Sequence, residues 1–278
     1  SRRMNDPRWS SRNWLLVSLL AVVMATATGI VALLGSGPVT VALGAVGVAL
    51  VAAALTVLAP ESLAAAWDEH RPYVYFSVGL FAFGGLVGAA LLVAGVDLTE
   101  LFLEALGEEF AGDGPEAEFD LELTATFFVL QNTPPFLFSI AGALTLGLFT
   151  ALVMVLNGVL VGNLALSMAG SVGADFVLVG LLPHGVFELP ALFVAAGVGF
   201  RLVHRFGQRV LGSRDAFVTK AYLSRTAVLV GFAWLLLVVA AFVEAYLTTA
   251  LLDALFAARL EDGAETSVPA LAVPGVLE

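Results

Sequence analysis

The 278-residue chain has no cysteine, which excludes disulfide bonds, thiolate nucleophiles and thiolate metal ligands. It has only three histidines and 13% charged residues, where a soluble domain has about a quarter. Twelve Lys and Arg stand against 23 Asp and Glu, and the net charge of −11 argues against a nucleic-acid partner. Apolar residues, in contrast, make up 60% of the sequence. This composition predicts an all-α polytopic membrane protein with the lipid bilayer as its main partner.

Five uncharged or nearly uncharged segments are long enough to cross the hydrocarbon core as helices, which takes about 20 residues. They are Trp14–Leu34, Pro38–Ala59, Tyr73–Val96, Pro134–Leu156 and Thr226–Ala250. The first two are separated by a short Gly-Ser-Gly link, so residues 1–60 are predicted to form an N-terminal two-helix hairpin. The fourth is predicted to begin at Pro134, because proline suits the first turn of a helix.

The apolar stretch at residues 157–200 is interrupted and is predicted to be broken. The residues expected to break its backbone are Gly158, Pro183, Gly185 and Pro190. Broken segments at membrane depth are stable where protein or a water-filled cavity covers the freed backbone groups.

The positions of the basic residues indicate whether the chain crosses the membrane an even or an odd number of times between them. Four arginines precede the first span and six basic residues lie in Arg201–Arg225, so both regions are predicted to be cytoplasmic. This places the protein in the cell membrane with a cytoplasmic N-terminus. The broken stretch then crosses the membrane either zero times, as a re-entrant segment beside five spans, or twice, which gives seven spans.

An acidic insert at residues 97–122 holds ten of the 23 Asp and Glu and no basic residue. The same parity predicts that it lies outside the cell. Clustered carboxylates can bind a divalent cation, but the spacing fits no calcium loop. The favoured interpretation is a solvated acidic protein surface of the kind found in salt-adapted, halophilic organisms. A second acidic segment, at residues 251–278, is predicted to be a C-terminal tail.

Four ionisable residues interrupt the apolar stretches: Asp175, His184, Glu188 and Glu244. Each costs a few kcal/mol near the bilayer centre and should therefore have a partner. His184 and Glu188 are four residues apart and share a face if the backbone there is helical. In the seven-span alternative Glu244 reaches the same layer, whereas in the re-entrant alternative it lies above them. Glu244 could also simply cap an interfacial helix. We expect His184, Glu188 and Glu244 to form an intramembrane polar site.

Motifs around these residues occur in a distinctive order. They are Gln131–Asn132, Asn157–Gly162, Leu182–Ala191 with its Pro-His-Gly-x-x-Glu core, Ala195–Phe200, and Ala240–Ala245. This pattern resembles the stage II sporulation protein M family over about residues 73–250. The N-terminal hairpin and the acidic insert depart from that family.

The resemblance implies a membrane component of a complex with peptidoglycan-remodelling enzymes during engulfment, without established catalysis of its own. It adds Asn132 and Asn157 to the polar site and attaches no activity to any residue. The acidic balance looks haloarchaeal, and such archaeal cells neither sporulate nor build peptidoglycan.

Three function classes follow. A non-enzymatic membrane scaffold, with a protein partner or a second copy of the chain, is favoured on family grounds. A transporter or channel is the alternative, because broken helices with buried His and Glu are typical of ion transport pathways. An intramembrane enzyme is least supported, since no HExxH, GxSxG or paired-aspartate motif occurs. The sequence therefore assigns no catalytic residue, cofactor or metal.

Overall fold

The computed structural model describes residues 11–99 and 124–257, and the elements in these residues are all helical. They are α1 (Ser11–Leu34), α2 (Val39–Leu58), α3 (Pro60–Val93), α5 (Ala125–Ala141), the 3-10 turn η1 (Gly142–Thr145), α6 (Leu148–Ser171), α7 (Ala174–Val210), α8 (Lys220–Phe242) and the π-helix η2 (Val243–Thr248). Most of the acidic insert and of the acidic tail lies outside the described residues.

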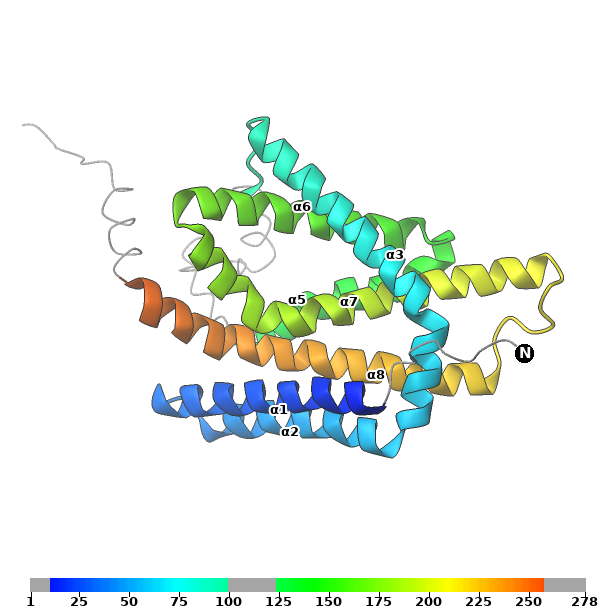
Figure 1. Ribbon diagram of the computed structural model, residues 1–278, viewed down its shortest axis with the longest axis horizontal. Coiled ribbons are helices and arrows are strands. Elements are labelled where there is room, and N and C mark those ends of the chain that lie inside the picture. The colour runs from blue at the N-terminus through cyan, green and yellow to red at the C-terminus, as the bar shows by residue number, and fades with distance from the viewer. Residues whose placement is uncertain (1–10, 100–123, 258–278) are drawn as a thin grey trace, which may run out of the picture.

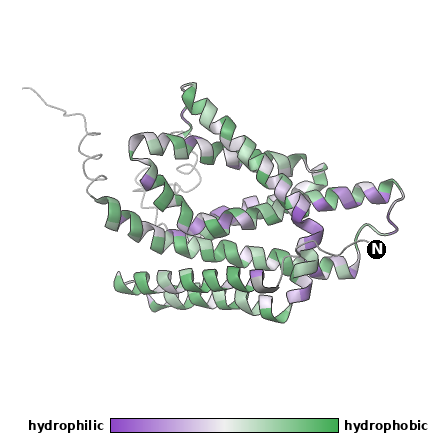
Figure 2. Cartoon of the chain, in the orientation of Figure 1, coloured by the Kyte–Doolittle hydropathy of each residue, from purple (hydrophilic) through white to green (hydrophobic). Residues whose placement is uncertain are grey.

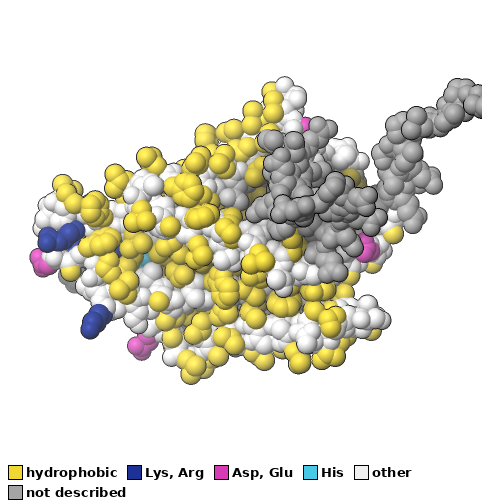
Figure 3. All heavy atoms as spheres, turned by 180° about the vertical axis from the view of Figure 1, so that it is seen from behind, with side chains coloured by type: hydrophobic (Ala, Val, Ile, Leu, Met, Phe, Trp, Pro, Cys, Tyr) yellow, Lys and Arg dark blue, Asp and Glu magenta, His cyan; other side chains and the backbone are white. Residues whose placement is uncertain are grey.

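Within the described ranges, seven helical segments are long and apolar enough to cross a membrane. The predicted all-α polytopic membrane class is confirmed. Residues 157–200 contribute to two of the seven segments, Leu148–Ser171 and Ala174–Val210, which favours the seven-span alternative over the re-entrant one. Hydrophobic residues run along the helices, and the hydrophilic ones concentrate toward one end of the bundle (Figure 2). The Lys and Arg visible on the opposite face gather at that end too (Figure 3).

The helices run back and forth between two ends of the bundle (Figure 1). The start of α1, the junction of α2 with α3 and the connection from α7 to α8 lie at one end. The α1–α2 and α6–α7 turns lie at the other. The basic region Arg201–Arg225 therefore lies at the end where α1 begins, as the charge-based parity requires.

The segment Lys220–Ala257, which begins with α8 and continues through η2, is the most enclosed of the seven. In its most apolar window 61% of residues are buried, against 17–33% in the other six. The N-terminal hairpin packs onto this helix, with Gly44 of α2 against the ring of Phe242. Trp14 of α1 makes edge-to-face contacts with Trp67 of α3 and Phe232 of α8. The hairpin is thus part of one shared core.

Helices α3 and α6 pack with their backbones in contact. Two glycine pairs form this contact: Gly84 and Gly88 on α3, Gly158 and Gly162 on α6. A Cβ atom at Gly88 would lie 2.0 Å from the carbonyl oxygen of Val159. Small residues four apart allow such close approach of helices in lipid. Gly158, predicted to break the backbone, lies instead inside an uninterrupted α6, where it serves packing.

The chain turns at positions other than those predicted. The predicted span Pro134–Leu156 is divided between α5 and α6, and Pro134 lies inside α5, which begins after its N-cap Thr124. The turn falls at Leu146 and Gly147, with φ of 54° and 83°. A left-handed backbone cannot continue a right-handed helix. A proline removes one hydrogen bond and crowds the carbonyl four residues earlier, which a helix can accommodate by a kink.

In α7, too, the residues predicted to break the backbone do not end the helix. It continues for 37 residues through Pro183, Gly185 and Pro190. The helix bends in its first half (Figure 1). A proline there lacks the N–H that would bond the carbonyl four residues earlier, which kinks a helix. These three residues, predicted to break the backbone, lie within a bent but continuous span.

A buried amide joins the end of α3 to α6. Asn163 is fully buried, and its Nδ2 donates to the carbonyl oxygens of Gly88 at 3.0 Å and Val96 at 2.9 Å. Its Oδ1 accepts from the backbone N–H of Leu98 at 2.8 Å. One side chain therefore satisfies three backbone groups where α3 ends, so this polar residue of the apolar stretch has a structural role.

Candidate functional site

The three side chains predicted to form an intramembrane site lie together. His184 and Glu188 share a face of α7, and Glu244 comes from η2. One ligating atom of each residue lies within 4.8 Å of those of the other two. Nε2 of His184 lies 3.9 Å from Oε1 of Glu244.

The π-helix η2 carries the part of the site that faces α7. A π-turn holds one residue more than an α-turn, and such segments are uncommon and frequent at functional sites. Glu244 and Thr248 both belong to η2, and the Oγ1 of Thr248 lies 3.4 Å from Nδ1 of His184. Both ring nitrogens of His184 therefore have η2 side chains beside them.

The site holds more acceptors than donors. The side chain of His184 is 9% exposed and that of Glu244 is 23% exposed, and Oε2 of Glu244 is buried without a hydrogen-bond partner. Among residues 11–99 and 124–257, no Lys or Arg forms an ion pair with Glu188 or Glu244. Buried carboxylates are costly unless they are paired. The arrangement therefore favours a shared proton or a bound cation.

The two asparagines that the resemblance added are not part of this group. Asn157 lies in α6, and its Nδ2 donates to the carbonyl oxygen of Val153 one turn earlier, at 2.8 Å. Asn132 lies half-buried on α5. Within the described part of the chain, neither forms a hydrogen bond with His184 or the two glutamates.

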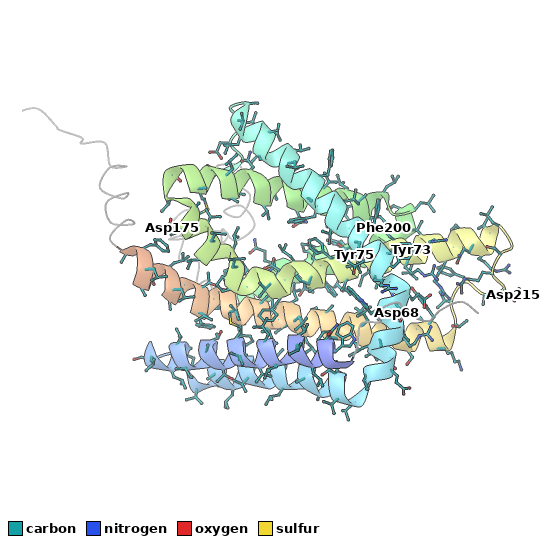
Figure 4. The ribbon with its side chains drawn as sticks, viewed as in Figure 1. Asp68, Tyr73, Tyr75, Asp175, Phe200 and Asp215 are labelled. Atoms are coloured by element: carbon teal, nitrogen blue, oxygen red, sulfur yellow. The ribbon has the colours of Figure 1, made fainter. Side chains whose placement is uncertain are left out.

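A second polar group, which the sequence analysis did not find, lies where α3 crosses α7 and α8. We call it the arginine cluster: Glu69, Arg201, Arg205 and Arg225. Oε1 of Glu69 accepts from Arg201 at 2.8 Å and from Arg205 at 2.7 Å, and Oε2 accepts from Arg225 at 3.3 Å. Figure 4 shows Tyr73 at this crossing and Asp175 toward the opposite end of α7.

Aromatic side chains enclose the arginine cluster. The Arg205 guanidinium lies 3.8 Å from the ring centre of Tyr222, a cation–π contact. His70 is fully buried, and its Nδ1 lies 2.7 Å from the Ala66 carbonyl oxygen, so this nitrogen is the donor. Nε2 of His70 then accepts from the Tyr222 hydroxyl, at 3.2 Å. One carboxylate, three guanidiniums and these rings thus connect three helices.

One sequence signal could have indicated part of the arginine cluster, whereas Glu69 was hidden by the predicted start of the third span. Arg201 and Arg205 are four residues apart, which puts them on one helical face. Glu69 lies in a charged segment that the prediction left outside the third span, because that span was taken to begin at Tyr73. In the structure α3 begins at Pro60, and this extension carries Glu69 to the arginines.

The family model described as stage II sporulation protein M matches residues 77–249. The chain belongs to the stage II sporulation protein M family. An uncharacterized protein of Methanocaldococcus jannaschii is 29% identical over 125 residues, which make up 43% of this chain and 68% of that protein. No solved structure matches the chain. The family assignment predicted from the motifs is confirmed.

The region that matches the stage II sporulation protein M model includes some of the features described above and leaves out others. It includes both glycine pairs, the three arginines of the arginine cluster, and His184, Glu188 and Glu244. The N-terminal hairpin and Glu69 precede it. The intramembrane site and the α3–α6 contact therefore lie in the part of the chain that the family model matches.

Proposed function

We propose that the protein is a non-enzymatic, multi-pass component of a cell-membrane complex, assembled with another protein or with further copies of itself. Family membership supports this proposal, and the α3–α6 contact carries it. The four glycines and Asn163 bring backbone against backbone at membrane depth, which favours a packed scaffold. In a transport pathway, small and polar residues at this depth would instead line a path for the cargo.

The mass of the assembly extracted from its native membrane tests this proposal. We expect the tagged chain, extracted in a mild detergent and measured by native mass spectrometry, to exceed the 28.9 kDa of one chain with a fixed subunit stoichiometry. Cross-linking in intact membranes before extraction should give the same stoichiometry.

Two results together would contradict the scaffold and favour transport. One is a single chain both in native extracts and after cross-linking. The other is proton or sodium flux in proteoliposomes that Glu188→Gln removes, because an amide cannot titrate or pair with a cation. Empty liposomes and Asp253→Asn, an exposed carboxylate beyond η2, are the controls for flux.

We further propose that the end of the bundle with Arg201–Arg225 faces the cytoplasm, because basic connections are retained there. Single cysteines are clean reporters in a chain without cysteine. We expect an impermeant thiol reagent to label Ser171→Cys, at the C-terminal end of α6, in intact cells. Ser213→Cys, which follows α7, should be labelled only in opened cells. The reverse pattern would invert the orientation, and labelling of both in intact cells would contradict two crossings by α6 and α7.

A further inference from the structure

The three acceptor groups on α7 and η2 lack a counter-charge. The Nε2 of His184 and Oε1 of Glu244, 3.9 Å apart, are too distant for a hydrogen bond, and Oε2 of Glu244 is buried without a partner. The described residues offer the two glutamates no arginine or lysine, in contrast to Glu69, which has three arginines. A cation among the three side chains would supply what this site lacks.

We propose that His184, Glu188 and Glu244 bind one divalent transition-metal ion, with Zn²⁺ the best match. Two carboxylates and a neutral imidazole carry a charge of −2, which a divalent ion cancels. An imidazole ligand suits Zn²⁺, Fe²⁺ and similar ions, whereas Ca²⁺ and Mg²⁺ take oxygen ligands. Zn²⁺ accepts three protein ligands and keeps a fourth position for water or another group.

The geometry needs only a small contraction to hold such an ion. Zinc–ligand distances of about 2.0–2.2 Å in a tetrahedron put the ligand atoms about 3.4 Å apart. The three ligand atoms already lie within 4.8 Å of one another. Glutamate side chains close such a difference by rotation about their side-chain bonds, without movement of α7 or η2.

Thr248 orients the imidazole for this role. Metal-bound histidines normally bond their second nitrogen to a neighbouring polar group, which fixes the ring. In this site Nδ1 of His184 lies 3.4 Å from Oγ1 of Thr248, and Nε2 is left toward Glu244. The bound ion would join the bent helix α7 to the π-helix at the end of α8. The irregular backbone of η2 would then serve to place Glu244 and Thr248 beside His184.

Metal content and thermal stability of the purified full chain test the site. After chelation with EDTA, we expect the protein to take up one Zn²⁺ per chain in calorimetry and to melt at a higher temperature with Zn²⁺, but not with Mg²⁺. Glu244→Gln and His184→Gln should lose binding, and Thr248→Val should weaken it by about 10-fold, the lower range for loss of an outer-shell partner. Asp253→Asn, an exposed acid in the same final span, should bind like the native chain.

The melting temperature without metal shows whether each variant has folded. Glu188→Gln, nearly identical in shape, should melt like the metal-free native chain yet gain nothing from Zn²⁺. Equal binding by the native chain and Glu244→Gln would show an adventitious ion only. That result, or no uptake by the native chain, would overturn the site while leaving the complex measured in native extracts unaffected.

Discussion

Replacing Gly88 with alanine is expected to destabilise the protein by about 1–3 kcal/mol or more, the range for an over-packed core. The new methyl would lie 2.0 Å from the carbonyl oxygen of Val159 and 2.8 Å from its carbonyl carbon. Backbone atoms cannot move aside as a flexible side chain can, so α3 and α6 must separate. Separation would also strain the hydrogen bond that Nδ2 of Asn163 on α6 donates to the carbonyl oxygen of Gly88 itself.

Gly79→Ala is the matched control, because it adds the same methyl to the same helix. A Cβ atom at Gly79 meets nothing within 4 Å. Alanine is intrinsically a better helix residue than glycine by about 1 kcal/mol, so this variant should be neutral or slightly more stable. Thermal unfolding in a mild detergent compares the two. Equal melting temperatures for Gly79→Ala and Gly88→Ala would refute the close contact of α3 with α6.

The glycines of α3 are evident in the sequence, but the sequence does not show which of them contact another helix. Gly79, Gly84, Gly85 and Gly88 all fit a close helix contact, yet Gly79 faces open space while Gly84 and Gly88 face a backbone. Only the facing residues of α6 separate these cases. The class of protein and its membrane helices were predictable because each depends on local composition and length.

Turn positions were harder to predict, because proline and glycine act through context. Pro134, Pro183 and Pro190 lie within helices, where neighbouring helices can tolerate a lost hydrogen bond. The actual turns coincide with residues of positive φ such as Gly147 and Gly173. Nothing in the local sequence distinguishes these two glycines from Gly158, which lies in a regular helix.

The polar residues show the same division between local and long-range information. The placement of His184 and Glu188 on one face followed from their spacing. Their approach to Glu244 was expected only in the seven-span alternative, which the structure favours. Glu69 escaped this reasoning, because a charged segment next to a span was interpreted as a connection, although α3 continues through it as a helix.

Glu69→Gln is expected to be among the most damaging single substitutions, with a loss of about 3 kcal/mol, the lower value for breaking a buried ion pair. The amide keeps the size of the side chain but leaves three guanidiniums without a negative charge. Arg201 and Arg205 cannot turn to water, because their side chains are 11% and 3% exposed, whereas Arg225 is 38% exposed. Most of the loss should therefore come from the two arginines on α7.

Asp68→Asn is the control for this substitution, since it neutralises the preceding residue on the same helix. Asp68 pairs with Arg71 at 4.0 Å, and both side chains are about one-third exposed. An exposed pair of this kind contributes about 0–1 kcal/mol, so its melting temperature should barely change. Adding Arg205→Leu to Glu69→Gln should recover part of the loss, because it removes the most buried of the unpaired charges. If the double variant melts no higher than Glu69→Gln, unpaired charge is not the cause of the instability.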